Sequence, residues 1–329
     1  YYYKRLESIT SFNNELNGYF QLCKFYTHLQ TPQYWSKKEK IVSYKWSDYQ
    51  PLAARLISRS IMDNSTVKLE QKRTTEIINA YLSSVNNDKY STSIDDIFYQ
   101  RLVGERLKNF YGKAIVKIGN KKITMTDLYK LKPVINSQEY KPLEQTIINA
   151  MHSLNPLHLK DGIKIFGLGD GHAGNLMTNN GLTDYFFIDY EYAGNHSPYV
   201  DMAKPIYLDS FWRVWLGDQI KTKENFKIQA KTIDDKLIID HNFQLSKIEF
   251  TILKSKMEGI IFEFNKHLGK NRVDSDWEDI LNSAIFCCAF LTKNITRFEE
   301  NLFLLNLTYA IISGSFVEYY KNILRAVPK

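Results

Sequence analysis

Residues 165–175 read I-F-G-L-G-D-G-H-A-G-N, and residues 185–196 read Y-F-F-I-D-Y-E-Y-A-G-N-H. Two short apolar runs each end close to an acidic residue, and glycines and a histidine crowd the first. Three interpretations fit such a pattern. The glycines bind a dinucleotide, the histidines bind catalytic metals, or the carboxylates hold the magnesium of a nucleotide.

The bulk composition is that of a globular protein. With 329 residues and 44% hydrophobic content, the chain can bury a substantial core. No apolar run reaches the roughly 18 residues of a membrane helix, and the N-terminus lacks the pattern of a secretory signal. We therefore expect a cytoplasmic protein that does not bind membranes. The formal charge of +7 is spread along the chain, and no nucleic-acid motif is present, so we expect no nucleic-acid partner.

The periodicity predicts a mainly helical α+β protein with a few short strands confined to its middle. A hairpin is expected near 114–125, around Gly119-Asn120, and two further strands at 163–166 and 185–188. The predicted helices cover 67–86, 93–112 (capped by Ser93 and ending at Gly112), 142–154, 200–216, 246–268 (ending at Gly269), 276–294 and 296–324.

The dinucleotide interpretation depends on Gly169, Gly171 and Gly174, which satisfy the G-x-G-x-x-G fingerprint. That motif also requires a helix and then a second parallel strand. Only ten residues, 175–184, separate Gly174 from Tyr185, and they include an Asn-Asn-Gly turn. Because a parallel crossover needs at least about a dozen residues, we expect a hairpin between the two strands and reject the dinucleotide site.

A metallophosphoesterase would bind its metals with Asp, His and Asn from several loops. Asp170-Gly-His172 and Gly194-Asn-His196 resemble two such loops, but no Asp-bearing segment between them is identifiable. We rank this interpretation third.

The spacing of Asp170, Asn175 and Asp189 favours the magnesium interpretation. In protein kinases the catalytic loop has its Asp and Asn five residues apart, and a magnesium-binding Asp follows a short hairpin. One carboxylate accepts the proton of the attacking hydroxyl, while the amide and the second carboxylate hold Mg²⁺ against the triphosphate.

The segments G-D-G-H-A-G-N-L-M, F-F-I-D-Y-E-Y-A-G and Asp201-Met-Ala together resemble the aminoglycoside phosphotransferase and choline kinase-like family. That family's pattern is close to H-G-D-x-H-x-x-N, then I-D-W/Y-E, then D-x-A. The resemblance implies a protein-kinase-like C-lobe over 1–329, with its catalytic core near 163–203. It implies that Asp170 is the catalytic base and that Asn175 and Asp189 bind Mg²⁺ and thereby ATP. His172 is the family's loop histidine, and Asp201 is the acid that tethers the catalytic loop.

Two departures from the family accompany this resemblance. Leu168 replaces the usual histidine before the catalytic Asp. The first 103 residues contain one glycine, Gly18, and we predict no strand set there, although Lys4 and Lys117 lie in strand-like settings. We therefore expect the chain to begin near the lobe junction, with an N-lobe of about 100 residues upstream. The alternative is a reduced protein that lacks this lobe.

The sequence thus predicts an ATP- and Mg²⁺-dependent phosphotransferase that acts on a small-molecule hydroxyl. The alternative is a nonenzymatic pseudokinase-like domain that binds a ligand or serves as a scaffold. The acceptor and the oligomeric state stay open. The aromatic content of 14% is enough for a cation-binding cage for a choline-like acceptor, but we favour core and surface packing as its explanation.

Overall fold

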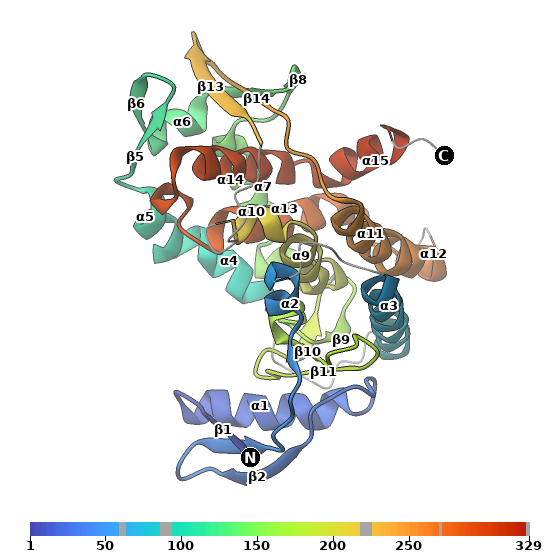
Figure 1. The fold of residues 1–329 in the computed structure, drawn as a ribbon. Coiled ribbons are helices and arrows are strands. Elements are labelled where there is room, and N and C mark those ends of the chain that lie inside the picture. Colours follow the sequence, from blue (N-terminus) through green and yellow to red (C-terminus); the bar gives the residue numbers. More distant parts are fainter. Residues whose placement is uncertain (59–63, 86–93, 218–225, 270–271, 327–329) are drawn as a thin grey trace. The chain divides into compact units, whose positions relative to one another are not determined.

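A computed structural model describes residues 1–58, 64–85, 94–217, 226–269 and 272–326. The chain is mainly helical with several small sheets, so the predicted α+β class is confirmed. Two compact units are present, each assembled from three stretches (Figure 1). The first unit comprises Tyr1–Ile94, Gly162–Ser210 and Ser246–Asp274, and the second comprises Asp95–Asp161, Phe211–Leu245 and Ser275–Lys329.

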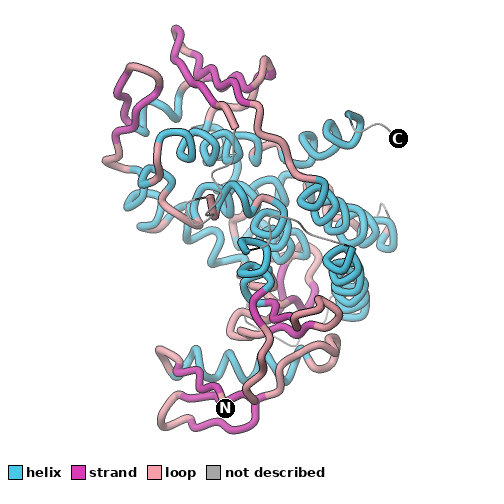
Figure 2. The backbone as a smooth tube through the Cα atoms, in the orientation of Figure 1, coloured by secondary structure: helices cyan, strands magenta, loops and turns pink. Residues whose placement is uncertain are grey.

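The first unit begins with a three-stranded antiparallel sheet of order β1-β3-β2 and a helix, α1, that lies against it (Figures 1 and 2). The elements are β1 (Tyr2–Arg5), α1 (Ile9–Leu22), β2 (Pro32–Ser36) and β3 (Ile41–Tyr44). The prediction of no strand set in the first 103 residues is therefore wrong. These strands have four or five residues, and most side chains of β1 and β2 are exposed, so no apolar alternation marks them.

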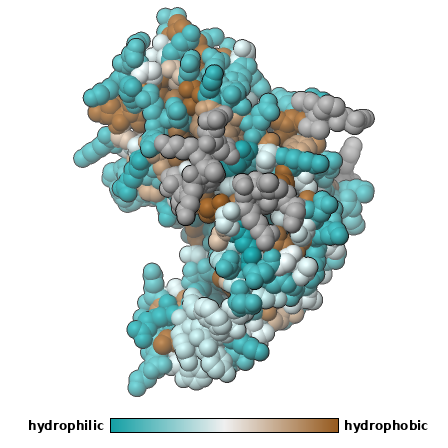
Figure 3. Space-filling view, viewed as in Figure 1, coloured by the Kyte–Doolittle hydropathy of each residue, from teal (hydrophilic) through white to brown (hydrophobic). Residues whose placement is uncertain are grey.

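The exposed side chains of this sheet are mainly aromatic, and the surface over it is pale, of intermediate hydropathy, in Figure 3. These exposed aromatic residues are Tyr1, which precedes β1, and Tyr2, Tyr3, Tyr34 and Trp35 within the sheet.

Two antiparallel strand pairs form the centre of the first unit. The pair β10 (Leu176–Thr178) and β11 (Tyr185–Phe187) is a hairpin, with β4 (Gln50–Pro51) on the other edge of β10. The pair β9 (Ile165–Gly167) and β12 (Gly194–His196) is separate. The predicted strands at 163–166 and 185–188 exist, but their pairing with each other is wrong. A strand that begins at Leu176, directly after the loop, takes the place of the first.

Helices complete the first unit: α2 (Leu52–Ser58), α3 (Asn64–Ser84), α9 (Pro198–Ser210), α11 (Lys247–Lys256), the π-helical turn η2 (Met257–Phe262) and α12 (Glu263–Leu268). The predicted helix at 246–268 is confirmed, with a capping box formed by Ser246 and Glu249 at its start. Gly269, at φ 74°, ends it in a conformation that favours glycine. The predicted helix at 67–86 corresponds to α3, and residue 86 lies outside the described residues.

The second unit combines helices with two sheets. Its helices are α4 (Asp95–Val103), α5 (Glu105–Tyr111), α6 (Met125–Lys130), α7 (Leu143–Ser153), α8 (Pro156–Leu159), α10 (Trp212–Trp215), α13 (Trp277–Leu291), α14 (Glu300–Ser313) and α15 (Phe316–Ala326), with a short 3₁₀ turn, η3 (Ile295–Arg297). The predicted hairpin is confirmed as β5 (Ile115–Ile118) and β6 (Lys121–Thr124).

Two predictions for the second unit are wrong. A four-stranded sheet contains β7 (Lys132–Ile135), β8 (Gln138–Glu139), β13 (Ile228–Ile233) and β14 (Lys236–His241), so strands are not confined to the middle of the chain. The helix expected at 296–324 is two helices at 98° to each other. No single helix of the described ranges has the length and apolar character to cross a membrane. The bent pair α14 and α15 has the required length and apolar character only when the two helices are taken together.

Candidate active site

The loop between β9 and β10 is held from α9 by Asp201. This buried carboxylate accepts hydrogen bonds from the backbone N–H of Gly169, at 2.6 Å, and from the hydroxyl of Tyr81 on α3. The contact expected of a tethering acid is therefore present. A Cβ at Gly167 would lie 2.5 Å from Asp201 Cγ, and one at Gly169 would overlap the carbonyl of Tyr192. These glycines thus permit close packing of the loop.

A buried network of four charged residues is hydrogen-bonded to the same loop. Its members are Glu70 and Arg73 on α3, Asp209 on α9 and Lys256 on α11. Arg73 donates to Asp209 at 2.8 Å and to the carbonyl of Gly171. Asp209 accepts from the N–H of Ala173 at 2.7 Å.

The charges of this network compensate one another. Burial alone would raise the pKa of Asp209, but the positive charges of Arg73 and Lys256 outweigh burial and hold that pKa below its usual value. Two cations and two carboxylates thus neutralise each other, and the network fixes the backbone on both sides of His172.

Asp170 lies at the turn that these contacts fix. Its Oδ1 is 2.7 Å from the ammonium of Lys204 on α9 and 3.4 Å from Nε2 of His172. The other ring nitrogen of His172 accepts from the N–H of Gly174 at 3.0 Å, so the histidine caps the short turn η1 (Ala173–Asn175). Only 15% of the Asp170 side chain is exposed, which leaves the carboxylate accessible but partly desolvated.

Asn175 and Asp189 meet at the open end of the β10–β11 hairpin. The carbonyl of Asn175 accepts from the N–H of Ile188, and the next pair along the ladder is Leu176 with Phe187. The side-chain amide of Asn175 donates to the carbonyl of Asp170 at 3.0 Å, so its oxygen is the atom that can ligate a cation. Asp189 adopts φ 68°, a left-handed conformation that aspartate tolerates better than most residues.

The N-terminal sheet contributes a lysine to this site, which sequence reasoning did not assign. The ammonium of Lys4 on β1 lies 2.9 Å from Oε2 of Glu15 on α1 and also pairs with Asp189. Glu15 is fully buried and accepts from the N–H of Tyr190, at 2.9 Å, and from the hydroxyl of Tyr44 on β3. Burial alone would lower the pKa of Lys4, but the charges of Glu15 and Asp189 outweigh burial and raise it.

Two features keep α1 close to Asp189. Gly18 faces the segment after Asp189, where a Cβ would overlap the carbonyl of Tyr190. The linker after α1 runs beside β11, because Phe187 donates to the carbonyl of His28 and accepts from the N–H of Gln30.

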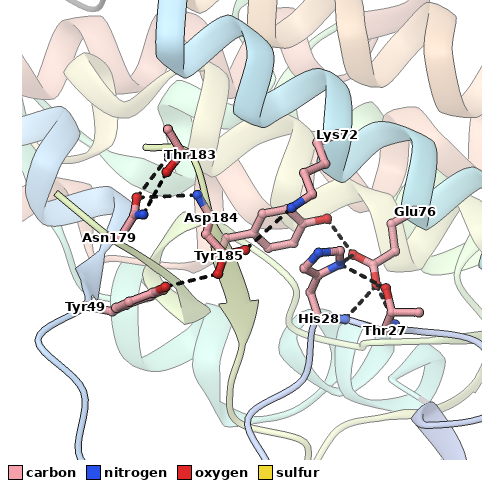
Figure 4. Close-up of polar contacts among 9 residues, drawn as sticks. All are labelled: Thr27, His28, Tyr49, Lys72, Glu76, Asn179, Thr183, Asp184 and Tyr185. Atoms are coloured by element: carbon pink, nitrogen blue, oxygen red, sulfur yellow. Dashed lines mark hydrogen bonds and ion pairs between the residues drawn. The ribbon is translucent and has the colours of Figure 1, made fainter. Parts of the chain in front are cut away.

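Glu76 on α3 secures that linker (Figure 4). Its carboxylate accepts from the backbone N–H groups of Thr27 and His28 and from the hydroxyl of Tyr185. The ring of His28 stacks on Tyr185, with 4.5 Å between the centroids. On the other side of the same hairpin, Asp184 accepts from Tyr49 at 3.0 Å.

The structure therefore brings all five predicted site residues into the first unit: Asp170, His172, Asn175, Asp189 and Asp201.

The metallophosphoesterase interpretation gains no support. Both ring nitrogens of His196 make contacts, to the N–H of Ile94 and the carbonyl of Tyr192. Within the described residues no group of three or more His, Cys, Asp or Glu could hold a metal ion. Asn175 with one carboxylate suits Mg²⁺, which takes few protein ligands together with substrate phosphates.

Comparison of the chain with models of known protein families finds no match, and comparison with curated proteins finds none either. The geometry of the residues therefore carries the functional argument by itself.

Proposed function

We propose that this protein transfers the γ-phosphate of ATP, with Mg²⁺, to a hydroxyl of a small molecule. The observation that carries the proposal is the chain of contacts from Lys4 to Glu15 and Asp189. In protein kinases a strand lysine paired with a helix glutamate, and a magnesium-binding Asp after the hairpin, must both be in place for catalysis. Lys4 and Glu15 did not contribute to the resemblance noted in the sequence, so they support the proposal independently.

Each residue then has a chemical task. Asp170 accepts the proton of the attacking hydroxyl, and its tethered loop keeps it in place. Asn175 and Asp189 would hold Mg²⁺, which neutralises charge on the β- and γ-phosphate oxygens when bound. In the presence of nucleotide the Lys4 ammonium leaves Asp189 and binds phosphate oxygens, while its contact with Glu15 keeps the ammonium oriented. Asp201 and the network around Arg73 position the loop and touch no substrate.

The decisive experiment is calorimetric titration of ATP, with and without Mg²⁺, into the wild type and three variants. Asp189→Ala and Lys4→Met each remove one partner of the chain of contacts. Asp184→Ala is the matched control, since that carboxylate belongs to the same hairpin but its side chain is 50% exposed. We expect Mg²⁺-dependent ATP binding in the wild type and in Asp184→Ala. Asp189→Ala should lose the Mg²⁺ dependence, and Lys4→Met should bind about tenfold or more weakly.

A wild type that binds no nucleotide in the presence of Mg²⁺ would contradict the proposal. In that case the nonenzymatic alternative, a domain that binds another ligand or a protein partner, takes its place.

A further inference from the structure

The proposed function leaves one charged residue beside Asp170 without a task. Lys204 lies on α9, three residues after Asp201, and its ammonium is 2.7 Å from Asp170 Oδ1. Its side chain is 12% exposed. The ammonium and the carboxylate therefore form an ion pair at the atom that is proposed to accept the proton. A cation at this position is also placed to meet the negative charge of a group that reacts beside Asp170.

Lys204 also lies near the segment that follows Asp189. Its ammonium lies 5.6 Å from the centre of the Tyr192 ring, three residues after Asp189. The backbone of Tyr192 is fixed by its carbonyl, which approaches Gly169 and accepts from His196. Burial raises the pKa of Tyr192, and the negative charges of Glu191, Asp170 and Asp189 raise it further.

We propose that Lys204 is a further catalytic residue, whose ammonium binds the phosphoryl group while it passes from the nucleotide to the acceptor. This inference rests on the proposed function. The acceptor oxygen forms a bond to the γ-phosphorus as the bond from that phosphorus to the β–γ bridging oxygen breaks. ADP leaves with the electron pair of the broken bond, and the hydroxyl proton moves to Asp170.

The proton transfer gives Lys204 its role. Asp170 loses its negative charge when it takes the proton, so the attraction that holds the ammonium falls. The equatorial oxygens of the phosphoryl group carry negative charge at that moment, and in this proposal the same ammonium binds them. Lys204 therefore exchanges one anion for another during the reaction.

The test compares the affinity for MgADP with the affinity for MgADP plus aluminium fluoride, which imitates the transferring phosphoryl group. The quantity measured is the ratio of the two affinities, by calorimetry. We expect the wild type to bind the complex with aluminium fluoride more tightly, and Lys204→Met to reduce the ratio by roughly 100-fold. Lys204→Arg, which keeps the charge, should retain most of the wild-type ratio of affinities. Lys254→Met on α11 is the control, because that side chain is 51% exposed, and its ratio should equal that of the wild type.

The outcomes separate this inference from the proposed function. If the wild type binds MgADP but Lys204→Met keeps its ratio, or if the wild type gains nothing from aluminium fluoride, the inference is overturned while nucleotide binding stands. If the wild type binds no MgADP, the proposed function fails and this inference fails with it. Should Lys204→Met not fold, Lys204→Gln serves in its place. A ratio for Lys204→Gln equal to that of Lys204→Arg overturns the role of the charge.

Discussion

The close approach of α1 to the segment after Asp189 makes Gly18→Ala a sharp test of how the site is assembled. In most helices this substitution stabilises a protein by about 1 kcal/mol. Here the new Cβ would overlap the carbonyl of Tyr190 and lie 3.1 Å from Cβ of Ala193. Because heavy atoms in contact prefer a separation of about 3.5 Å, the two segments must move apart by roughly 1 Å. Overpacking of this kind costs about 1–3 kcal/mol, which offsets or exceeds the gain in helix propensity.

The displacement reaches the site directly. Glu15 lies on α1 only three residues before Gly18, so it would move away from the N–H of Tyr190 and carry Lys4 with it. Misplacement of catalytic groups by about 1 Å can cost about 100-fold in activity. We expect Gly18→Ala to lower the free energy of unfolding by up to about 2 kcal/mol. We expect it to weaken MgATP binding about tenfold or more.

Urea unfolding and calorimetry on three proteins measure both quantities. The wild type and Gly18→Ala are compared with Gly181→Ala, in the turn between β10 and β11. A Cβ there would lie 3.6 Å from the nearest atom of Thr183, an ordinary contact, so this control should match the wild type. If Gly18→Ala also matches the wild type in stability and in MgATP affinity, α1 does not depend on the close approach, and the reasoning is refuted.

Two further predictions concern groups that support the site. Arg73→Met should lower the free energy of unfolding by about 3–5 kcal/mol, because it leaves the buried carboxylates of Glu70 and Asp209 with one cation. Lys72→Met changes the neighbouring, exposed side chain and should alter the free energy of unfolding by less than about 1 kcal/mol. If urea unfolding gives the same free energy for Arg73→Met and Lys72→Met, the role of the network is contradicted. The pKa of Glu76 lies below its usual 4.5, because hydrogen bonds from Tyr185 and from the N–H groups of His28 and Thr27 outweigh burial. Its stabilisation is therefore complete above about pH 4.5 and is lost as the pH falls through the lowered pKa. Glu76→Gln should lower the free energy of unfolding by about 1–3 kcal/mol at neutral pH, and its free energy of unfolding should fall less steeply with acid than that of the wild type. The exposed control Glu39→Gln should behave like the wild type. An equally steep fall with acid in the wild type and in Glu76→Gln would count against this account.

The helix at 246–268 was predicted well because its apolar residues recur with helical period and because the cap and the glycine stop also fit. The helices expected at 200–216 and at 296–324 are each two helices in the structure. The spacing of Asp170, Asn175 and Asp189 could predict that they lie near one another because one short loop and one hairpin connect them. Their role as site residues stays a prediction. Residues that are close together in the sequence determine such local geometry.

The missed features are those made by contacts between distant segments. Glu70 and Arg73 look like an ordinary pair on a helix surface, and only the fold shows that Asp209 and Lys256 enclose them. Lys4 was noticed as a lysine in a strand-like run, but its partner Glu15 lies on a different element and carries no motif. The parallel pairing of β14 with β7 joins segments about 100 residues apart, and no local pattern encodes it.

Glu15 has a consequence for how this protein can vary. One carboxylate accepts from β1 through Lys4, from β3 through Tyr44 and from the loop after Asp189 through Tyr190. The last of these donors is a backbone N–H, which no substitution other than proline removes. A change in either side-chain donor leaves two contacts intact, whereas a change at Glu15 breaks all three at once. Substitutions should therefore be tolerated unequally here. Tyr44 is open to replacement, Lys4 is constrained by its proposed contact with phosphate, and Glu15 is nearly fixed.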